Sequence, residues 1–174
     1  MHNINEVRGE MFLFNFKNPE ETLKWVSLDD RVMGGASRSR LDYSGENAAF
    51  KGEVRLVENR PGFASVRSKN SSIDLKAFEG LSVRVRGDGK VYRLNIKTDR
   101  HHDGFLYQYA FKTEEGEWMD IAVPFENFRP SFRGRAAKDA RPPDAGKIMS
   151  LGLMISGQEG KFVLEIEHIK AYRK

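Results

Sequence analysis

The stretch from Gly80 to Thr113 constrains the fold more than any other part of this chain, because apolar and polar side chains alternate along it. Apolar residues occupy every second position in 81–85 and again in 92–96, which is typical of strands with one buried face. The turn Arg86-Gly87-Asp88-Gly89-Lys90 favours a hairpin between them, since Gly and Asp tolerate the positive φ of a tight reversal. A third run, 106–111, makes this unit the middle of an antiparallel sheet.

Similar short runs recur along the chain, and we expect about nine or ten strands with turns about every eight to twelve residues. The segment Asn18-Pro19-Glu20-Glu21 has the form of a helix start, with Asn as cap and Pro at the first helical position. The sequence therefore predicts an all-β protein, an antiparallel β-sandwich or jelly roll with one short N-terminal helix. No repeat or linker interrupts the pattern, so we expect one domain over residues 11–172 after a polar N-terminal extension, residues 1–10.

Composition limits the compartment and the chemistry. Cysteine is absent, which excludes disulfides, thiol nucleophiles and cysteine-bound zinc. The polar stretch Met1–Glu10 lacks the apolar core of a signal peptide, and no apolar run approaches the roughly 20 residues that span a bilayer. These features predict a cytoplasmic protein without a membrane span, and they leave open peripheral association with the inner membrane through a partner.

The positive charge is concentrated in one segment. The 174-residue chain has a formal net charge of +4, and the segment Arg129–Arg141, with five cations and one anion, carries a surplus of the same size. A protein that coats nucleic acid usually spreads its basic residues over a whole face. The concentration in one segment makes nucleic acid an unfavoured partner and favours an acidic protein partner or lipid head groups.

Phenylalanine and arginine interleave in this segment, which makes it the first candidate for a binding site. Arginine and aromatic side chains are enriched at protein interfaces, and the prolines nearby limit the freedom of the chain. Alternatively, the phenylalanines close the end of the sandwich and the arginines pair internally, and the sequence allows both. The predicted partner-binding residues are Phe128, Arg129, Phe132, Arg133 and Arg135.

Two further groups could bind ligands. Arg93, Gln108 and Trp118 could line a sheet face that stacks on sugar rings or holds a peptide. Ordinary core packing is the alternative, and we favour it for the neighbouring Tyr107 and Phe111. Asp29 and Asp30 could offer oxygens to calcium. Their spacing matches no ligand-loop template, so we favour carboxylates that cap backbone N–H groups, and we expect no metal.

The sequence offers no set of residues for catalysis. His101-His102-Asp103 is the only histidine cluster; adjacent strand residues point to opposite faces, so we expect a solvated loop there. No G-x-S-x-G motif occurs. We therefore expect a protein that is not an enzyme and has no cofactor; its oligomeric state is not determined by these features.

Several fragments in order resemble one family, the complex I intermediate-associated protein 30 family, over roughly residues 12–171. The matching fragments are Val32-Met33-Gly34-Gly35-Ala36-Ser37, Phe50-Lys51-Gly52, residues 62–68, residues 84–92, Tyr107-Gln108, residues 124–134 and residues 148–155.

The resemblance implies a galactose-binding-like jelly roll without established catalytic residues. It implies an assembly factor for respiratory NADH:ubiquinone oxidoreductase, whose partner is a respiratory-complex subunit or assembly intermediate. The alternative is a carbohydrate-binding module on the same fold. Mitochondrial members carry a targeting extension, whereas this chain starts almost at the domain, which fits a bacterial, cytoplasmic relative or a chain trimmed to the domain.

Overall fold

The last strand of the chain, β14 (Gly160–Tyr172), determines the order of one whole sheet because it pairs with three other strands. Its first half pairs with β5 (Ala48–Val54) and its second half with β2 (Glu10–Asn15) along the same edge. The opposite edge pairs with β7 (Gly80–Arg86). The computed structural model describes residues 6–7, 9–58, 61–100, 105–139 and 141–173.

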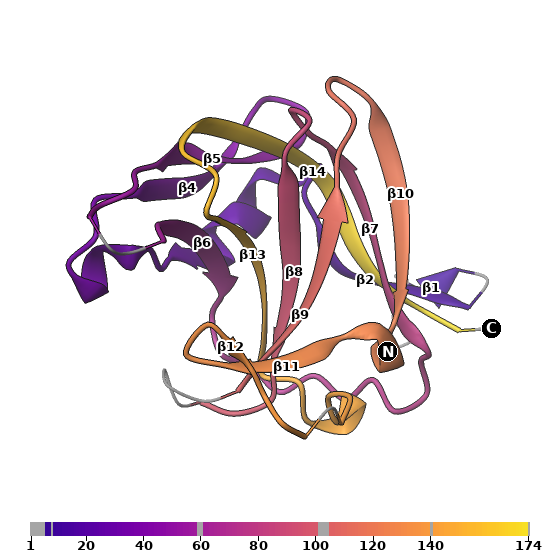
Figure 1. The fold of residues 1–174 in the computed structure, drawn as a ribbon. Helices are drawn as coiled ribbons and strands as arrows, with labels where there is room; N and C mark the ends of the chain where they lie inside the picture. The colour runs from indigo at the N-terminus through magenta and orange to yellow at the C-terminus, as the bar shows by residue number, and fades with distance from the viewer. Residues whose placement is uncertain (1–5, 8, 59–60, 101–104, 140, 174) are drawn as a thin grey trace.

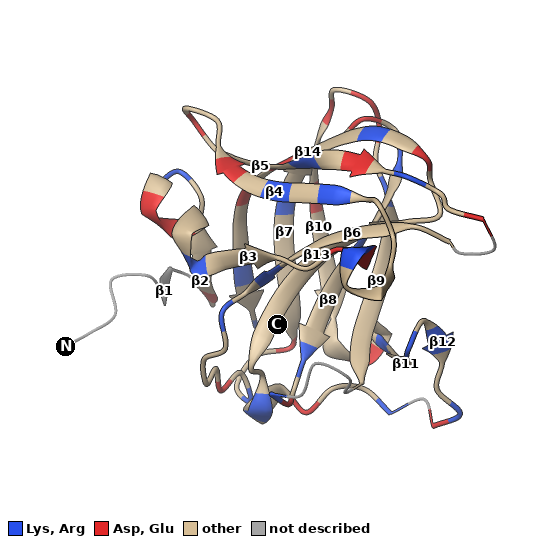
Figure 2. Cartoon of the chain, turned by 90° about the vertical axis from the view of Figure 1, so that its left-hand side faces the viewer, with Lys and Arg blue, Asp and Glu red and all other residues tan. Residues whose placement is uncertain are grey.

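The strands form two seven-stranded antiparallel sheets that lie face to face (Figures 1 and 2). The first sheet also contains β1 (Glu6–Val7), β4 (Arg38–Tyr43) and β10 (Trp118–Pro124). The second sheet runs in the order β12 (Arg135–Ala136), β11 (Arg129–Phe132), β9 (Leu106–Lys112), β8 (Val91–Lys97), β13 (Ser150–Ser156), β6 (Phe63–Ser68) and β3 (Trp25–Ser27). The antiparallel β-sandwich predicted from the sequence is confirmed.

The core lies between the sheets and is built from the alternating apolar positions. Phe50 and Phe162 of the first sheet contact each other with ring centroids 4.9 Å apart, and Tyr92 of the second sheet lies 6.3 Å from Phe50. Large aromatic side chains bury the most apolar area per residue. These three rings therefore contribute strongly to holding the two sheets together.

The hairpin predicted across residues 80–97 is wrong, although both of its strands exist. The two edges of β7 pair with β10 and β14, so no edge is left for β8, which lies in the other sheet between β9 and β13. Alternation specifies that a strand has one buried face, but it does not specify in which sheet the strand lies. The turn at 86–90 therefore crosses from one sheet to the other.

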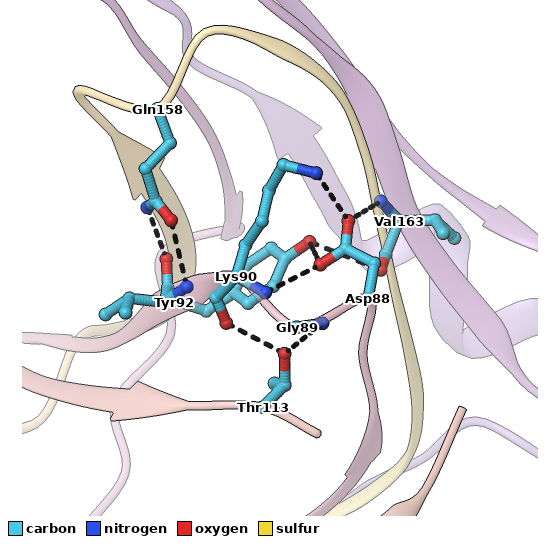
Figure 3. A network of polar contacts seen from close by, with 8 residues as sticks. Asp88, Gly89, Lys90, Tyr92, Thr113, Gln158 and Val163 are labelled. Carbon is cyan, nitrogen blue, oxygen red and sulfur yellow. Dashed lines mark hydrogen bonds and ion pairs between the residues drawn. The ribbon is translucent and has the colours of Figure 1, made fainter. Parts of the chain in front are cut away.

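The side chain of Asp88 fixes this crossing (Figure 3). Its carboxylate accepts hydrogen bonds from the backbone N–H of Val163 at 3.0 Å and from the Tyr92 hydroxyl at 2.9 Å. Thr113 at the end of β9 accepts the N–H of Gly89 at 3.1 Å and donates to the Lys90 carbonyl at 2.8 Å. The crossing is thus tied to strands of both sheets.

The helices of the described residues are short 3₁₀ turns. The predicted N-terminal helix is confirmed as η1 (Pro19–Lys24), with the Asn18 side chain accepting the N–H of Glu20. The others are η2 (Asp30–Met33), η3 (Phe125–Asn127) and η4 (Ala145–Lys147). None of them is long and apolar enough to cross a bilayer.

His168 on β14 lies against β2. Its ring contacts Phe12 edge-on at 5.7 Å between centroids. Burial lowers the pKa of His168 below its usual value near 6.5, and the charge of Lys170 lowers it further. Glu167 opposes this shift without cancelling it. The neutral imidazole is therefore the form that the folded protein prefers.

We expect this preference to make stability depend on pH. Because the folded pKa lies below the unfolded pKa, the contribution of His168 is complete above about pH 6.5 and is lost as the pH falls toward the folded pKa. A His168→Gln variant should therefore lose less stability between pH 7 and pH 5 than the wild type. Urea unfolding at several pH values measures this difference, and equal pH dependence in both proteins would contradict it.

Candidate functional site

The predicted partner-binding segment forms the outer edge of the second sheet. It begins in η3 and continues through the hairpin of β11 and β12, which pairs with β9. Phe128 is fully buried and Phe125 nearly so, and both belong to the core. These two rings anchor the segment; beyond them Arg129 and Phe132 are exposed, whereas Pro130 between them is buried.

The exposed half of the segment carries an aromatic pair. Phe132 is 41% exposed and Phe105, just before β9, is 47% exposed. Their ring centroids are 5.6 Å apart, and the guanidinium of Arg133 lies 5.3 Å from the Phe132 ring. The cluster of Phe105, Phe132 and Arg133, here called the hairpin cluster, combines apolar area with positive charge.

Arg133 adopts a backbone conformation that its side chain disfavours. Its φ is +49°, and it is the one non-glycine residue with positive φ in the described part of the chain. For a residue with a side chain this conformation costs about 1 kcal/mol or more. Gly134, which follows it, has φ +77° without that cost. The turn of the hairpin therefore stores strain at an exposed arginine.

A polar row crosses the outer face of the second sheet and reaches this hairpin. Strand register places its residues opposite one another, from β3 through β6, β13, β8 and β9 to β11: Val26, Arg67, Gly152, Asn95, Gln108 and Arg129. Gln108 donates to the Asn95 side chain at 3.1 Å and accepts from the Ser131 hydroxyl at 3.3 Å. The row is therefore continuous with β11.

The structure brings together two of the three predicted ligand-face residues. Arg93 and Gln108 lie on the outer face of the second sheet, on adjacent strands. Trp118 lies on β10 of the first sheet, where its ring contacts the guanidinium groups of Arg84 at 5.2 Å and Arg86 at 4.9 Å. A single ligand face containing all three is therefore not formed.

The sequence did not reveal three residues of the candidate site: Arg67 and Asn95 in the polar row, and Phe105 in the hairpin cluster. Burial lowers the pKa of Arg67, and the negative charge of Asp99 partly opposes this. Asn95 is buried although it lies on the outer face. Alternation had placed Arg67 on the side opposite Val66, but nothing local indicated that Asn95 and Arg67 share one cross-strand row.

Asp29 and Asp30 join the edges of the two sheets. Asp30 is buried and accepts from the N–H and hydroxyl of Ser37 at 2.9 and 2.8 Å and from the N–H of Phe63 at 3.0 Å. Asp29 accepts from Ser39 on β4 and from the N–H of Ser65 on β6. Both carboxylates thus cap backbone N–H groups, as their spacing in the sequence predicts.

Gly35 makes room for the buried carboxylate. A Cβ atom at this position would lie 2.4 Å from Asp30 side-chain atoms, far inside van der Waals contact. The Gly34-Gly35 pair is thus needed both for the turn, where Gly34 has φ +84°, and for the space around Asp30.

Within the described residues, no group of three or more His, Asp or Glu side chains could hold a metal ion. The His101-His102-Asp103 cluster lies outside the described residues.

Comparison with known proteins assigns the family. The family model described as complex I intermediate-associated protein 30 matches residues 14–166. This chain belongs to the complex I intermediate-associated protein 30 family. The family member of Drosophila melanogaster is 28% identical over 180 residues, covering 90% of this chain and 61% of the relative. That of Mus musculus is 28% identical over 181 residues, covering 92% of this chain and 55% of the relative.

The chain thus spans little more than half the length of these family relatives. Both are named mitochondrial, as is the member from Neurospora crassa. The cytoplasmic location predicted from the sequence is contradicted by these names. That prediction rested on the composition of the first ten residues and on a resemblance to bacterial relatives, and neither observation determines a compartment.

Solved structures agree on the fold of this family member. A family 11 carbohydrate-binding module of a cellulosomal cellulase of Clostridium thermocellum superposes with a TM-score of 0.69 at 18% identity, covering 97% of each chain. An agarase gives a TM-score of 0.68 at 14% identity, covering 96% of this chain and 25% of the agarase. At such identities the likeness establishes the β-sandwich alone.

We expect Asp30→Ala to destabilise the protein by about 2–4 kcal/mol, because buried donors on Ser37 and Phe63 lose their acceptor. Asp74→Ala is the matched control, since Asp74 is exposed and accepts from the N–H of Lys76 near the surface. Asp74→Ala should change the free energy of unfolding by less than about 1 kcal/mol. Urea unfolding of both variants tests this, and equal effects would contradict the structural role of Asp30.

The two phenylalanines of the candidate segment should respond differently to truncation. Phe128→Ala should cost about 3–5 kcal/mol because it opens a cavity in the core. Phe132→Ala should cost less than about 1 kcal/mol because the ring is already 41% exposed. Thermal and urea unfolding measure both, and a large loss for Phe132→Ala would show that this ring holds the fold together.

Proposed function

We propose that this chain is a non-catalytic binding module that takes part in the assembly of respiratory NADH:ubiquinone oxidoreductase by contacting a protein partner. The observation that supports it best is the hairpin cluster, in which two exposed aromatic rings and an arginine with positive φ lie at the edge of the second sheet. The relatives are named as proteins associated with an intermediate of complex I, and assembly is the process in which such an intermediate forms. We place the contact with the protein partner at the hairpin cluster.

The chemistry of the hairpin cluster fits a protein interface. Burying the exposed aromatic area against a partner stabilises the complex. Arginine and aromatic residues are also among those that contribute most to the binding energy of protein interfaces. The strain at Arg133 would be removed by glycine at no cost to the turn. The Arg133 side chain at this position contacts the exposed Phe132 ring and adds positive charge to it.

The rest of the segment favours a partner surface with negative charge. Arg129 and Arg135 flank the hairpin cluster, and Arg129 is exposed with its guanidinium donating to the Glu126 carbonyl at 2.6 Å. Figure 2 shows the basic positions of β11 and β12 at this end of the sandwich. A surplus of positive charge accelerates encounter with an acidic surface and makes binding weaken as salt rises.

A carbohydrate ligand is the alternative, and the polar row supports it. Arginine and amide side chains that cross a sheet in one line suit the hydroxyl groups of an extended glycan. Sugar rings, however, usually stack on aromatic side chains, and the row of Arg67, Asn95, Gln108 and Arg129 contains none. We therefore place the glycan second, and a glycan array that detects binding lost on Gln108→Ala would reverse this order.

The proposal predicts what a tagged protein captures from its own organism. The wild type should copurify with subunits of respiratory NADH:ubiquinone oxidoreductase, whereas the double variant Phe132→Ala, Arg133→Gly should lose about tenfold or more of that yield. Arg133→Gly keeps the turn because glycine accepts the same φ. Quantitative mass spectrometry of the captured proteins gives the comparison.

The control removes the same kinds of groups from another edge of the molecule. Leu23, which is 72% exposed, and Lys24 lie on η1 and supply an exposed apolar side chain and a cation. Leu23→Ala, Lys24→Ala should capture as much as the wild type. Undiminished capture by the hairpin variant, or an equal loss in the control, would overturn the proposed interface.

A further inference from the structure

A basic hollow lies on the first sheet, away from the hairpin cluster and the polar row. It has a volume of about 710 Å³ and is formed by β4, β5, the start of β14 and the turn at 88–90. Five cations and three carboxylates line it: Arg38, Arg40, Lys51, Lys90, Lys161, Glu53, Asp88 and Glu115. Figure 2 shows the basic positions on β4 beside those of the neighbouring strands.

Strand register arranges most of these side chains in two cross-strand rows on one face of the sheet. The first row is Arg38, Glu53 and Lys161, and the second is Arg40, Lys51 and Val163. Strand residues directly opposite each other have Cβ atoms about 4.5–5.5 Å apart. Arg38 and Lys161 are separated by β5, about 10 Å at the usual strand spacing, and their long side chains can reach one small ligand that lies between them.

The second row contains a like-charged pair. Arg40 and Lys51 lie directly opposite each other, an arrangement that destabilises a sheet. The exposed carboxylate of Asp42 contacts both, at 2.5 Å from Arg40 Nε and 3.8 Å from Lys51 Nζ. One carboxylate cannot neutralise two cations, so positive charge remains in the middle of the hollow.

The first row contributes further uncompensated charge. In the part of the chain that the structure describes, Arg38 and Lys161 form no ion pair, and Glu53 between them lies 3.5 Å from Arg55. A second hollow of about 420 Å³ adjoins the first and shares Arg38 and Glu53 with it. Arg31 and Arg55 line this extension, so the basic surface continues past β4.

One wall of the hollow is fixed in place. Asp88 accepts the N–H of Val163 at 3.0 Å and lies 3.4 Å from Lys90 Nζ (Figure 3). Gln158 binds the backbone of Val91, donating at 2.7 Å and accepting at 3.0 Å. Lys90 is therefore held on a braced turn rather than on a loose loop, which reduces the entropy lost when a ligand binds.

We propose that this hollow is a binding site for a ligand with a multiply charged phosphate group. Planar guanidinium groups and lysine point charges that approach from three strands match the several oxygens of phosphate. A ligand with a single carboxylate group would pair with only one or two of these cations. Glu53, between Arg38 and Lys161, and Glu115 also line the hollow and repel a long polyanion, so a compact polyphosphate or a phosphorylated head group fits better than nucleic acid.

The first experiment titrates the full chain with inorganic tripolyphosphate in a calorimeter at low salt. The wild type should bind, and Arg38→Gln, Lys161→Gln should bind about tenfold or more weakly, since two of the five cations that line the hollow are lost. Lys69→Gln, Lys147→Gln carries the same change in net charge on exposed residues outside the hollow. This control should bind as the wild type does.

A second arm separates the sources of the phosphate. Vesicles of phosphatidylcholine with and without an anionic phospholipid are sedimented with the same three proteins. Binding to tripolyphosphate alone assigns the site to a soluble phosphate. Binding to the anionic vesicles assigns it to a lipid head group. Either result supports the proposal when Arg38→Gln, Lys161→Gln weakens the binding. Binding to neither probe, or equal weakening in the control, overturns it.

A third variant distinguishes a binding role from a structural one. Lys51→Gln removes the like-charged pair with Arg40, so its Tm without ligand should equal or exceed that of the wild type, while its affinity for tripolyphosphate falls. A Lys51→Gln protein that binds tripolyphosphate as tightly as the wild type would overturn the site.

Discussion

Backbone hydrogen bonding along both edges of β14 is the constraint on which the rest of the first sheet depends. The strand is 13 residues long and takes β5 and β2 on one edge and β7 on the other. It therefore joins segments from the beginning, the first third and the middle of the chain. A buried strand that pairs on both edges leaves few backbone groups unsatisfied. The last segment of the sequence thus completes a sheet that the earlier segments cannot form by themselves.

Aspartate side chains connect the two sheets where backbone pairing ends. Asp88 accepts from Val163 and Tyr92 at the crossing after β7, and Asp30 accepts from Ser37 and Phe63 between the edges of β4 and β6. Buried or half-buried carboxylates are stable only when donors surround them. Their oxygens are occupied by the protein itself, which explains why acidic residues near glycine turns need not indicate a ligand.

The two proposed surfaces lie on different sheets and use different chemistry. The hairpin cluster combines exposed aromatic rings with an arginine at the edge of the second sheet, whereas the hollow on β4, β5 and β14 of the first sheet gathers cations around a polar depression. The hollow and the hairpin cluster share no residue. A protein partner and a phosphate-bearing ligand could therefore be held by the same domain at the same time.

The sequence by itself determined the all-β class, the N-terminal helix and which side of most strands is buried, because alternation and turn residues are local signals. It also located the segment that carries Phe128 and Phe132. Only the tertiary structure decided that β7 and β8 lie in different sheets, that Trp118 is separated from Gln108, and that Arg40 lies opposite Lys51. Strand pairing joins residues far apart in the chain, and no local pattern specifies which edge a strand will meet.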